Sequence, residues 1–266
     1  MLKRLLAHPL TQGLDINDPK TTARRREIIL SKPFLKRVYE DWYTRVVTSL
    51  PDASGPSGAL VEIGSGGGFF DQIKPETVTS EIFFLPSVRA VLDATALPFQ
   101  SASLRALVMV DVLHHICAVR DFLAEASRCV APGGRIIMIE PWVSAWSRYV
   151  YGRLHHEPFR PDAVDWEFPS CGPLSGANGA LPWIIFERDR SSFETDFPEW
   201  CIERVEPFMP FRYLFSGGVS LRSLAPNLAY QPFVWLERFL TPYMERFAMF
   251  AHIVITRTEF GTSLRE

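Results

Sequence analysis

The sequence has little cysteine and no long apolar run. Its four cysteines are Cys117, Cys129, Cys171 and Cys201. They form no Cys-x-x-Cys pair and have no histidine at zinc-finger spacing, so a reduced, cytoplasmic setting is the default. The longest apolar runs, 136–139 and 248–255, are far too short to cross a bilayer, and His8-Pro9 interrupts the apolar N-terminus before a signal peptide can form. A soluble chain is therefore expected.

Strong charge of either sign is also missing. The formal net charge is −2, which gives no overall attraction to nucleic acid. The distribution is uneven, because residues 1–50 carry a net charge of +5 and the remainder carries −7. We interpret the basic excess as a solvated helix face in preference to an anion-binding site.

The composition is sufficient for one large domain with additions, since 47% of the 266 residues are hydrophobic. Apolar doublets at helical spacing predict an amphipathic helix over 34–50, and residues 52–58 form a Pro/Gly/Ser linker. A second helix is predicted over 119–130, before the turn Pro132-Gly133-Gly134. Short β-rich runs predict buried strands at 60–63, 88–92, 107–110 and 135–139. The order strand, helix, strand implies a parallel crossover.

The second half of the chain is harder to interpret. Residues 141–200 lack clear periodicity and are rich in Trp, Phe, Pro and Gly, so they are predicted to form an irregular lid carried on the sheet. Two further strands are expected at 201–208 and 250–256, with a helical stretch near 234–240 between them. The chain then divides into an N-terminal helical extension (1–58), a cofactor-binding core (59–140), a lid or substrate-binding insertion (141–200) and C-terminal strands (201–266).

A glycine-rich stretch, LVEIGSGGGFF, follows the first predicted strand. Bare backbone at this position lets a ligand approach where any Cβ would exclude it. The dinucleotide pattern G-x-G-x-x-G would put Phe69 at its third glycine, which disfavours a nicotinamide cofactor. The glycines instead fall at Gly64, Gly66 and Gly68, two residues apart, and Glu62 precedes them.

This spacing resembles the first motif of the class I S-adenosylmethionine-dependent methyltransferases, and four further stretches agree in order. They are Val78-Thr79-Ser80-Glu81, Leu92 to Phe99 (LDATALPF), Ala106 to Ile116 (ALVMVDVLHHI) and Val130 to Arg135 (VAPGGR). The resemblance implies an α/β fold, a Rossmann-like seven-stranded and mostly parallel sheet with helices on both faces and an antiparallel last strand. The region covered is roughly 59–140.

The resemblance also implies a cofactor, S-adenosylmethionine, and residues that bind it. In the family, the acid that ends the second strand takes the ribose hydroxyls, the adenine-site Asp meets the exocyclic amine of adenine, and Asp111 would orient the methionine portion. The implied cofactor-binding residues are Glu62, Gly64, Ser65, Gly66, Gly68, Glu81, Asp93, Ala94 and Asp111. One departure is the short spacing after Gly68 and after Glu81, which predicts truncated or absent helices there.

Candidate catalytic residues should stand at the carboxyl ends of the strands. Asp111, His114 and His115 follow the predicted fourth strand, and Glu140 ends the fifth. His114 or His115 is either a general base or a loop-packing residue, and Glu140 either faces the acceptor or caps a backbone amide. His155-His156-Glu157 offers metal-ligand types, but adjacent side chains diverge and no second ligand group is near in sequence, so no metal site is predicted.

The function expected from these features is methyl transfer to a small or lipid-like metabolite, with oxygen as the favoured acceptor atom and nitrogen next. Residues 141–200 and the helix at 34–50 are expected to close over the cofactor and form the acceptor pocket, with Trp142 and Trp183 among its walls. The alternative is a non-catalytic cofactor-binding subunit whose basic amphipathic N-terminus contacts a partner or a membrane surface. Nucleic acid is not expected as a partner, and the oligomeric state is left open.

Overall fold

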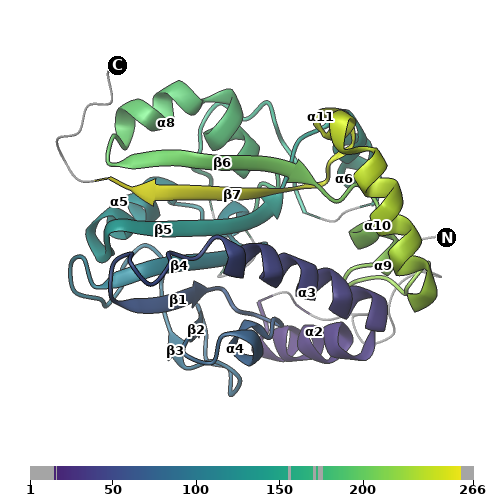
Figure 1. Cartoon of the computed structure of the whole chain (residues 1–266), viewed down its shortest axis with the longest axis horizontal. Helices are drawn as coiled ribbons and strands as arrows, with labels where there is room; N and C mark the ends of the chain where they lie inside the picture. Colours follow the sequence, from purple (N-terminus) through teal and green to yellow (C-terminus); the bar gives the residue numbers. More distant parts are fainter. Residues whose placement is uncertain (1–14, 16, 155–156, 170–171, 173–175, 259–266) are drawn as a thin grey trace.

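The computed structural model describes residues 15, 17–154, 157–169, 172 and 176–258 (Figure 1). A seven-stranded sheet with the order β3-β2-β1-β4-β5-β7-β6 runs through the molecule. Neighbouring strands from β3 to β5 pair in parallel, whereas β7 is antiparallel to both β5 and β6. The strands are β1 (Ala59–Ile63), β2 (Val78–Glu81), β3 (Ala90–Val91), β4 (Leu104–Val110), β5 (Val130–Pro141), β6 (Trp200–Phe208) and β7 (Phe250–Arg257). The predicted fold class is confirmed.

Helices cover both faces of the sheet and gather at one end of it. Figure 1 shows α2, α3, α9 and α10 at the end toward which β1 and β4 point. Longer α-helices of the described chain are α2 (Pro19–Ser31), α3 (Pro33–Thr48), α5 (Val119–Cys129), α6 (Ala145–Leu154), α8 (Arg190–Asp196) and α10 (Tyr230–Phe239). Shorter pieces are α4 (Phe70–Ile73), α7 (Leu181–Trp183), α9 (Arg212–Ser216), α11 (Met244–Phe247), the 3-10 turns Leu113–His115, Asn227–Ala229 and Thr241–Tyr243, and the π-helical turn Ile184–Arg188.

Alternation along the strands divides the core into two layers. Val61, Met109 and Ile136 face one layer with α5, whereas Leu60, Val108 and Ile137 face the other with α3. Both layers are fully buried, as expected for parallel strands with helices on both faces. Helices α3 and α5 begin and end close to the predicted bounds of 34–50 and 119–130. No helix of the described residues is long and apolar enough to span a membrane.

The connections near the glycine-rich stretch are short, as predicted. The only helix between β1 and β2 is the four-residue α4, and the eight residues between β2 and β3, all of which are described, contain none. The predicted strand 88–92 is reduced to Ala90–Val91. The predicted turn at 132–134 is wrong: these residues form a bulge within β5, because the pairing partner of β4 shifts from Val130 to Arg135.

The segment 141–200, predicted to be an irregular lid, combines short helical pieces with a non-helical stretch over the described residues between 157 and 180. This segment contains α6, α7, a π-helical turn and α8. Its last third packs against the face of the sheet, where Phe186, Phe193 and Phe197 join the same core layer as α5. The reason is topological: β6 begins at Trp200 opposite Arg257, near the amino-terminal end of β5, so the chain has to return along the sheet after β5 ends.

Candidate cofactor and acceptor site

The glycine-rich loop leaves β1 at Ile63 and turns sharply. Gly64 and Gly66 have φ values of +63° and +50°, a region that favours glycine. A Cβ on Gly64 would lie 2.7 Å from a methyl of Val112, and one on Gly68 would collide with the hydroxyl of Tyr43. At Gly66 the nearest atoms are 3.6 Å away. The loop therefore needs glycine for its own packing at Gly64 and Gly68, and Gly66 is the position that faces open space.

Hydrogen bonds hold this loop against β2. The Ser65 backbone N–H donates to the Ser80 carbonyl at 2.7 Å, and the Ser65 hydroxyl accepts from the Ser80 N–H at 3.1 Å. The Ser80 hydroxyl in turn donates to the Glu62 carbonyl at 2.8 Å. Ser65, predicted as a cofactor-binding residue, has a side chain that is buried and engaged in the fold.

A cavity of about 110 Å³, here called the glycine-loop cleft, opens at the carboxyl ends of β1, β2 and β4. It is lined by Thr22, Arg25, Ile29, Tyr39, Tyr43, Glu62, residues 64–68, Glu81, residues 110–112, His115, Tyr213 and Val219. Open α/β sheets bind ligands at this edge. Predicted site residues Glu62, Gly64, Ser65, Gly66, Gly68, Glu81, Asp111 and His115 all line it.

Helix α2 covers part of this cleft and was not predicted. Thr22, Arg25 and Ile29 of α2 are among the lining residues, and the Arg26 guanidinium donates to the Gly68 carbonyl. The helix is difficult to detect because two of its four buried residues are threonines, so it shows no apolar stripe. One signal was present: Asp18 caps the helix by accepting from the Lys20 N–H, and Pro19 occupies its first turn.

Two carboxylates line the floor of the cleft. Glu62 is 2% exposed, its Oε2 has no hydrogen-bond partner among the described residues, and burial raises the pKa of its carboxyl group to about 7. Glu81 Oε2 accepts from the Gly66 N–H at 3.1 Å, and its Oε1 accepts from the Ile82 N–H at 2.9 Å. Burial also raises the pKa of Glu81. The Glu62 carboxylate thus keeps an oxygen available for a ligand in the cleft.

An outer pocket adjoins the cleft and shares Gly64, Glu81, Val112 and His115 with it. Asp93 and Ala94, the predicted adenine-site residues, line this outer pocket. Asp93 is exposed, and its Oδ1 accepts from both the N–H and the hydroxyl of Thr95, at 2.8 and 2.7 Å.

Asp111 directly follows β4 and lines two of the cavities of the molecule. Its φ of +62° is in the left-handed region, and its N–H donates to the Ile139 carbonyl at 2.8 Å. Burial raises the pKa of its carboxyl group to about 6. Asp111 lines both the glycine-loop cleft and a much smaller cavity of about 10 Å³, room for about one water molecule, here called the inner chamber. The other residues that line the inner chamber are Pro141, Tyr151, Glu157, Pro158, Phe159, Gly179, Tyr213 and Phe250.

Glu140 is fully buried and caps the loop after β4. Its Oε1 accepts from the N–H groups of Val112 and Leu113, each at 2.8 Å, and its Oε2 lies 2.8 Å from His114 Nδ1. Neither the cleft nor the inner chamber includes it. The sequence left open whether Glu140 faces the acceptor or caps a backbone amide, and these contacts correspond to the capping of backbone amides.

The two histidines lie side by side, with ring centroids 4.2 Å apart, but their surroundings differ. Burial alone would lower the pKa of His114, but Glu140 and Glu157 beside its ring outweigh this and raise it. Burial, followed by the neighbouring His114, lowers the pKa of His115 to about 3. His115 Nδ1 lies 3.1 Å from the Gly176 carbonyl oxygen, and its ring borders the cleft, whereas His114 is 1% exposed.

Glu157 joins this group from the segment after β5, which sequence reasoning did not anticipate. Its carboxylate oxygens lie 3.5 Å from His114 Nε2 and 3.9 Å from His115 Nε2. His155 and His156, named with Glu157 in the sequence, lie outside the described residues. The association depends on how the chain crosses the carboxyl edge of the sheet, and no local spacing encodes it.

The tryptophans expected in the acceptor pocket lie elsewhere. Trp142 and Trp183 pack in the core layer that contains α5, and neither lines the cleft or the inner chamber. The expectation for these two residues is therefore wrong. The aromatic side chains that line these cavities are Tyr39, Tyr43, Tyr151, Phe159, Tyr213 and Phe250.

A sheet with this strand order, an antiparallel β7 and a glycine-loop cleft at its carboxyl edge defines the class I methyltransferase fold. Residues 70–138 match the family model described as a methyltransferase domain. Geranyl diphosphate C-methyltransferase from Streptomyces coelicolor A3(2) superimposes with a TM-score of 0.51 at 13% identity, over 95% of this chain and 89% of that one. A second geranyl diphosphate methyltransferase structure gives 0.50 at 13% identity, over 95% and 96%.

A 37.1 kDa protein of transposon TN4556 from Streptomyces fradiae is 34% identical over 94 residues, which are 35% of this chain. The matched region covers 26% of the length of that curated relative. Residues 70–138 thus match a methyltransferase domain, and the described chain has the fold of the class I, S-adenosylmethionine-dependent methyltransferases. The predicted resemblance is confirmed, and with it S-adenosylmethionine as the methyl donor of the class.

Proposed function

We propose that the protein transfers the methyl group of S-adenosylmethionine to an oxygen atom of a small, partly aromatic or apolar molecule that carries no strong negative charge. The observation that carries this proposal is the adjacency of two cavities. The glycine-loop cleft has the position and the acids that suit the cofactor, and the inner chamber meets it at Asp111. A donor in the cleft and an acceptor group reaching Asp111 from the side of the inner chamber would meet there, provided that the residues lining this small chamber move apart.

The residues of the cleft fit the cofactor. Glu62 offers an unpartnered buried carboxylate oxygen to the ammonium group of the methionine portion, and the absence of a side chain at Gly66 leaves room above the loop. Glu81 stands at the end of β2, where ribose hydroxyls would be bound, and Asp93 lines the outer pocket where adenine would lie. The cluster of acids favours a ligand that is cationic at both its sulfonium and its ammonium groups.

When bound, S-adenosylmethionine supplies an already activated methyl group, so the chain has to align an acceptor, exclude water and accept a proton. Asp111 is placed for the proton, because it borders both cavities and its pKa of about 6 leaves it ionised yet moderately basic at neutral pH. His115, with a pKa of about 3, is a much weaker base. In this proposal His114 and Glu140 hold the loop after β4 in position.

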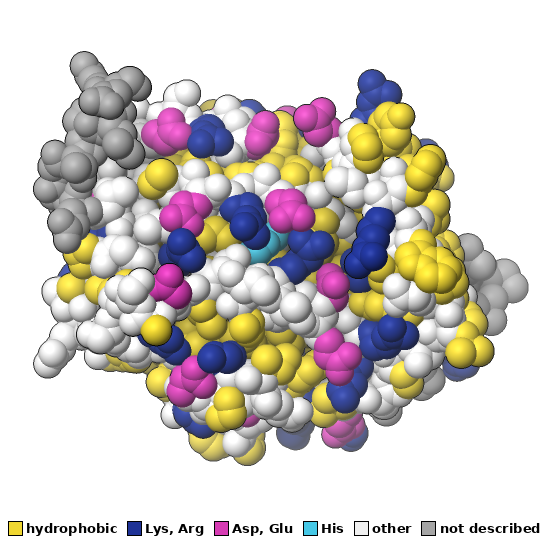
Figure 2. Space-filling model, in the orientation of Figure 1, with side chains coloured by type: hydrophobic (Ala, Val, Ile, Leu, Met, Phe, Trp, Pro, Cys, Tyr) yellow, Lys and Arg dark blue, Asp and Glu magenta, His cyan; other side chains and the backbone are white. Residues whose placement is uncertain are grey.

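The lining of the inner chamber restricts the acceptor. It carries the carboxylates of Asp111 and Glu157 beside aromatic rings, and among the residues that the structure describes no Lys or Arg lines it. Without a bound cation, the diphosphate of geranyl diphosphate, the ligand of a structural neighbour, would face these two carboxylates and is therefore disfavoured. The surface gives no reason to expect nucleic acid either, since Figure 2 shows basic and acidic side chains intermingled on the visible face.

The non-catalytic alternative invokes the basic amphipathic N-terminus, of which residues 1–14 and 16 lie outside the described residues and helix α3 lies within them. In the structure the apolar face of α3 is buried: Phe34, Val38 and Trp42 are at most 1% exposed and pack against the sheet. Helix α3 instead contributes Tyr39 and Tyr43 to the cleft. The helix is therefore part of the site and is not presented to a partner or a membrane.

Calorimetric titration with S-adenosylhomocysteine, followed by transfer of labelled methyl groups to a panel of acceptors, tests the proposal. We expect binding in the micromolar range or tighter, and methylation of neutral phenols or alcohols in preference to phosphorylated compounds. Binding without transfer to any acceptor in the panel would support the non-catalytic alternative. Absence of binding, with the protein folded, would refute the proposal.

A further inference from the structure

We propose that His114, His115 and Glu157 form a binding site for a divalent transition-metal ion of the zinc type, placed between the glycine-loop cleft and the inner chamber. One ligand atom from each of these residues lies within 4.8 Å of the other two. Two imidazoles and one carboxylate are ligands that zinc and its neighbours in the first transition series accept, and a catalytic site of this kind keeps a further position open.

The separations between the ligand atoms suit such an ion. Bonds of about 2.1 Å in tetrahedral geometry place ligand atoms about 3.4 Å apart. The carboxylate oxygens of Glu157 lie 3.5 Å from His114 Nε2 and 3.9 Å from His115 Nε2. Both distances exceed the 2.7–2.9 Å typical of a charged hydrogen bond. The two distances belong to different oxygens, Oε2 toward His114 and Oε1 toward His115, and one ligand atom from each residue lies within 4.8 Å of the others, so an ion would draw these atoms closer by up to about 1.4 Å.

The hydrogen bonds behind the two rings orient them as they are oriented in metal sites. His114 Nδ1 lies 2.8 Å from Glu140 Oε2, and His115 Nδ1 lies 3.1 Å from the Gly176 carbonyl oxygen. Both partners are acceptors, so each Nδ1 carries a hydrogen and Nε2 is the nitrogen that each ring can offer to an ion, which would take the place of any proton held there. A ligating histidine characteristically bonds a carboxylate or carbonyl through its other nitrogen, which fixes the ring and raises its basicity.

The supporting carboxylate is itself held rigidly. Glu140 accepts from the N–H groups of Val112 and Leu113, and these belong to the loop that carries both histidines. Adjacent side chains normally diverge, but the 3-10 turn Leu113–His115 brings the two rings to 4.2 Å. The arrangement therefore places two Nε2 lone pairs toward one carboxylate, with the opposing nitrogens already satisfied.

The charge and position of this group indicate a role for the ion. Three carboxylates, Asp111, Glu140 and Glu157, surround it, and a dication would offset their repulsion. Since His115 borders the cleft and Glu157 borders the inner chamber, an ion held between them would face an acceptor oxygen. This role rests on the proposed methyl transfer; the binding of the ion does not.

The bonds that form and break in methyl transfer are the same with the ion present. The acceptor hydroxyl gives its proton to the Asp111 carboxylate, the oxygen forms a bond to the methyl carbon, and the bond from that carbon to sulfur breaks to leave S-adenosylhomocysteine. The ion acts as a Lewis acid that lowers the pKa of the hydroxyl, and it undergoes no redox change. The proton then passes from Asp111 to solvent.

Cobalt(II), which reports its coordination through visible absorption bands, is the probe for the test. Chelator-treated protein titrated with Co²⁺ should bind one ion per chain, with the intense bands of a four- or five-coordinate site. Glu157→Gln and His115→Ala should each weaken binding by at least about 100-fold, and Glu140→Gln by about 10- to 100-fold through loss of ring orientation. The exposed Glu167→Gln, from the same segment, is the matched control and should bind as the parent does.

Circular dichroism establishes that each variant is folded before its titration is interpreted. A double replacement of His155 and His156 by Ala should retain the bands; their loss in that variant, or their persistence in Glu157→Gln and His115→Ala, would overturn the proposal. Failure of the parent to bind Co²⁺ would also overturn it. A parallel titration with S-adenosylhomocysteine separates this outcome from a failure of the proposed function, because the cleft residues Glu62 and Gly66 are not part of the metal site.

Discussion

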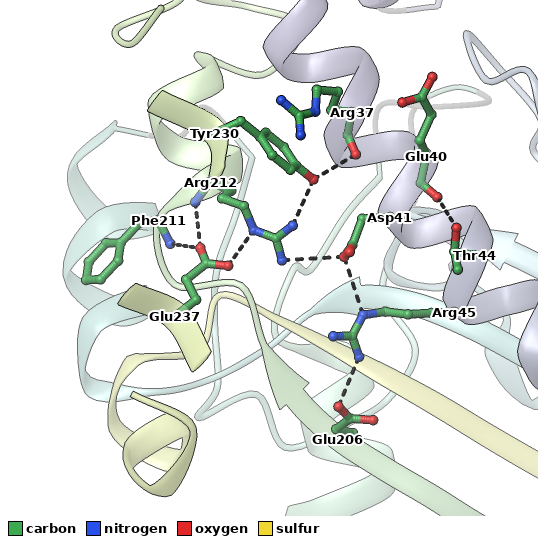
Figure 3. Close-up of polar contacts among 10 residues, drawn as sticks. All are labelled: Arg37, Glu40, Asp41, Thr44, Arg45, Glu206, Phe211, Arg212, Tyr230 and Glu237. Atoms are coloured by element: carbon green, nitrogen blue, oxygen red, sulfur yellow. Dashed lines mark hydrogen bonds and ion pairs between the residues drawn. The ribbon is translucent and has the colours of Figure 1, made fainter. Parts of the chain in front are cut away.

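Two groups of charged side chains, each with buried members at its centre, differ in how their charges are satisfied. The Arg212 network comprises Asp41, Arg45, Glu206, Arg212, Tyr230 and Glu237, and Figure 3 shows its bonds. The acid cluster comprises Glu62, Glu81, Asp111, Glu140 and Glu157. In the first group cations and anions alternate, whereas in the second the acids outnumber the cations near them.

Every charged group at the centre of the Arg212 network has partners within the chain. Glu237 accepts from the N–H groups of Phe211 and Arg212 and from the Arg212 guanidinium. The same guanidinium donates to Tyr230 at 2.8 Å and to Asp41 at 3.4 Å. The network ties α3, α9 and α10 together (Figure 3). In the acid cluster, by contrast, burial raises the pKa values of Glu62, Glu81 and Asp111, and a Glu62 oxygen has no partner among the described residues.

This difference separates a structural role from a functional one. A buried network that is complete needs nothing from solution, whereas buried acids in excess destabilise the ligand-free protein and become favourable when a cation is bound. The acid cluster lies at the edge of the sheet where ligands bind, and the Arg212 network lies to one side of it. In the Arg212 network, partners within the chain offset the free-energy cost of burying charge. In the acid cluster, a bound cationic ligand would offset it.

The largest expected effect comes from breaking the complete network. Arg212→Met should lower the free energy of unfolding by about 3–5 kcal/mol, because it leaves the Glu237 carboxylate buried without its cation. Urea denaturation at neutral pH measures this loss. The double variant Arg212→Met/Glu237→Leu should recover most of it, since both charges are then removed. A single-variant loss below about 1 kcal/mol would show that the network is not structural.

The second effect concerns the position in the glycine loop that faces the cleft. Gly66→Val should reduce S-adenosylhomocysteine affinity by at least about 100-fold, because a branched side chain at φ +50° is strained and occupies the cleft. Isothermal calorimetry measures the affinity. Gly152→Ala is the control, since a Cβ at Gly152 would meet nothing within 4 Å. Unchanged binding by folded Gly66→Val would remove this loop from the cofactor site.

The third effect distinguishes the two groups by pH. The folded-state pKa of Glu62, about 7, lies above its ordinary value of 4.5, so the protonated form is favoured by folding. Stability from this preference is complete below pH 4.5 and is lost as the pH rises to about 7. Glu62→Gln should therefore raise the free energy of unfolding of the ligand-free protein at pH 8 by on the order of 2 kcal/mol, and change it little at pH 4.5.

Urea denaturation of Glu62→Gln at the two pH values, with the exposed Glu167→Gln as control, measures this difference. The same Glu62→Gln substitution should weaken S-adenosylhomocysteine binding at pH 8, because the neutral amide cannot pair with the ammonium group. A stabilised protein that binds its ligand less well is the behaviour expected of an acid retained for function. If Glu62→Gln destabilises the ligand-free protein at pH 8, the carboxylate is structural.

The sequence was sufficient to predict the sheet and the glycine loop, because buried parallel strands are apolar runs and the turns between them are short. It could not predict α2, whose buried residues include Thr21 and Thr22. It also could not place Glu157 beside His114 and His115, because that contact is made by chain crossing the edge of the sheet. The sequence indicated Glu140 as a candidate site residue. Whether its carboxylate faces the acceptor or caps backbone amides depends on how β4 and β5 pair, which the sequence does not give.

The smallest effect tests the outer pocket. Asp93→Ala should weaken S-adenosylhomocysteine binding by about tenfold, near the lower limit for a charged hydrogen bond, because Asp93 is exposed and its Oδ1 already accepts two bonds from Thr95. Thr95→Val removes the hydroxyl bond to Oδ1 but keeps the carboxylate, so it should cost threefold or less. If the two variants lose affinity equally in calorimetry, Asp93 acts by shaping its loop and does not contact adenine. The prediction is sharper with S-inosylhomocysteine, which lacks the exocyclic amine: Asp93→Ala should bind it as the parent does, because the contact that the substitution removes is one that this ligand cannot make.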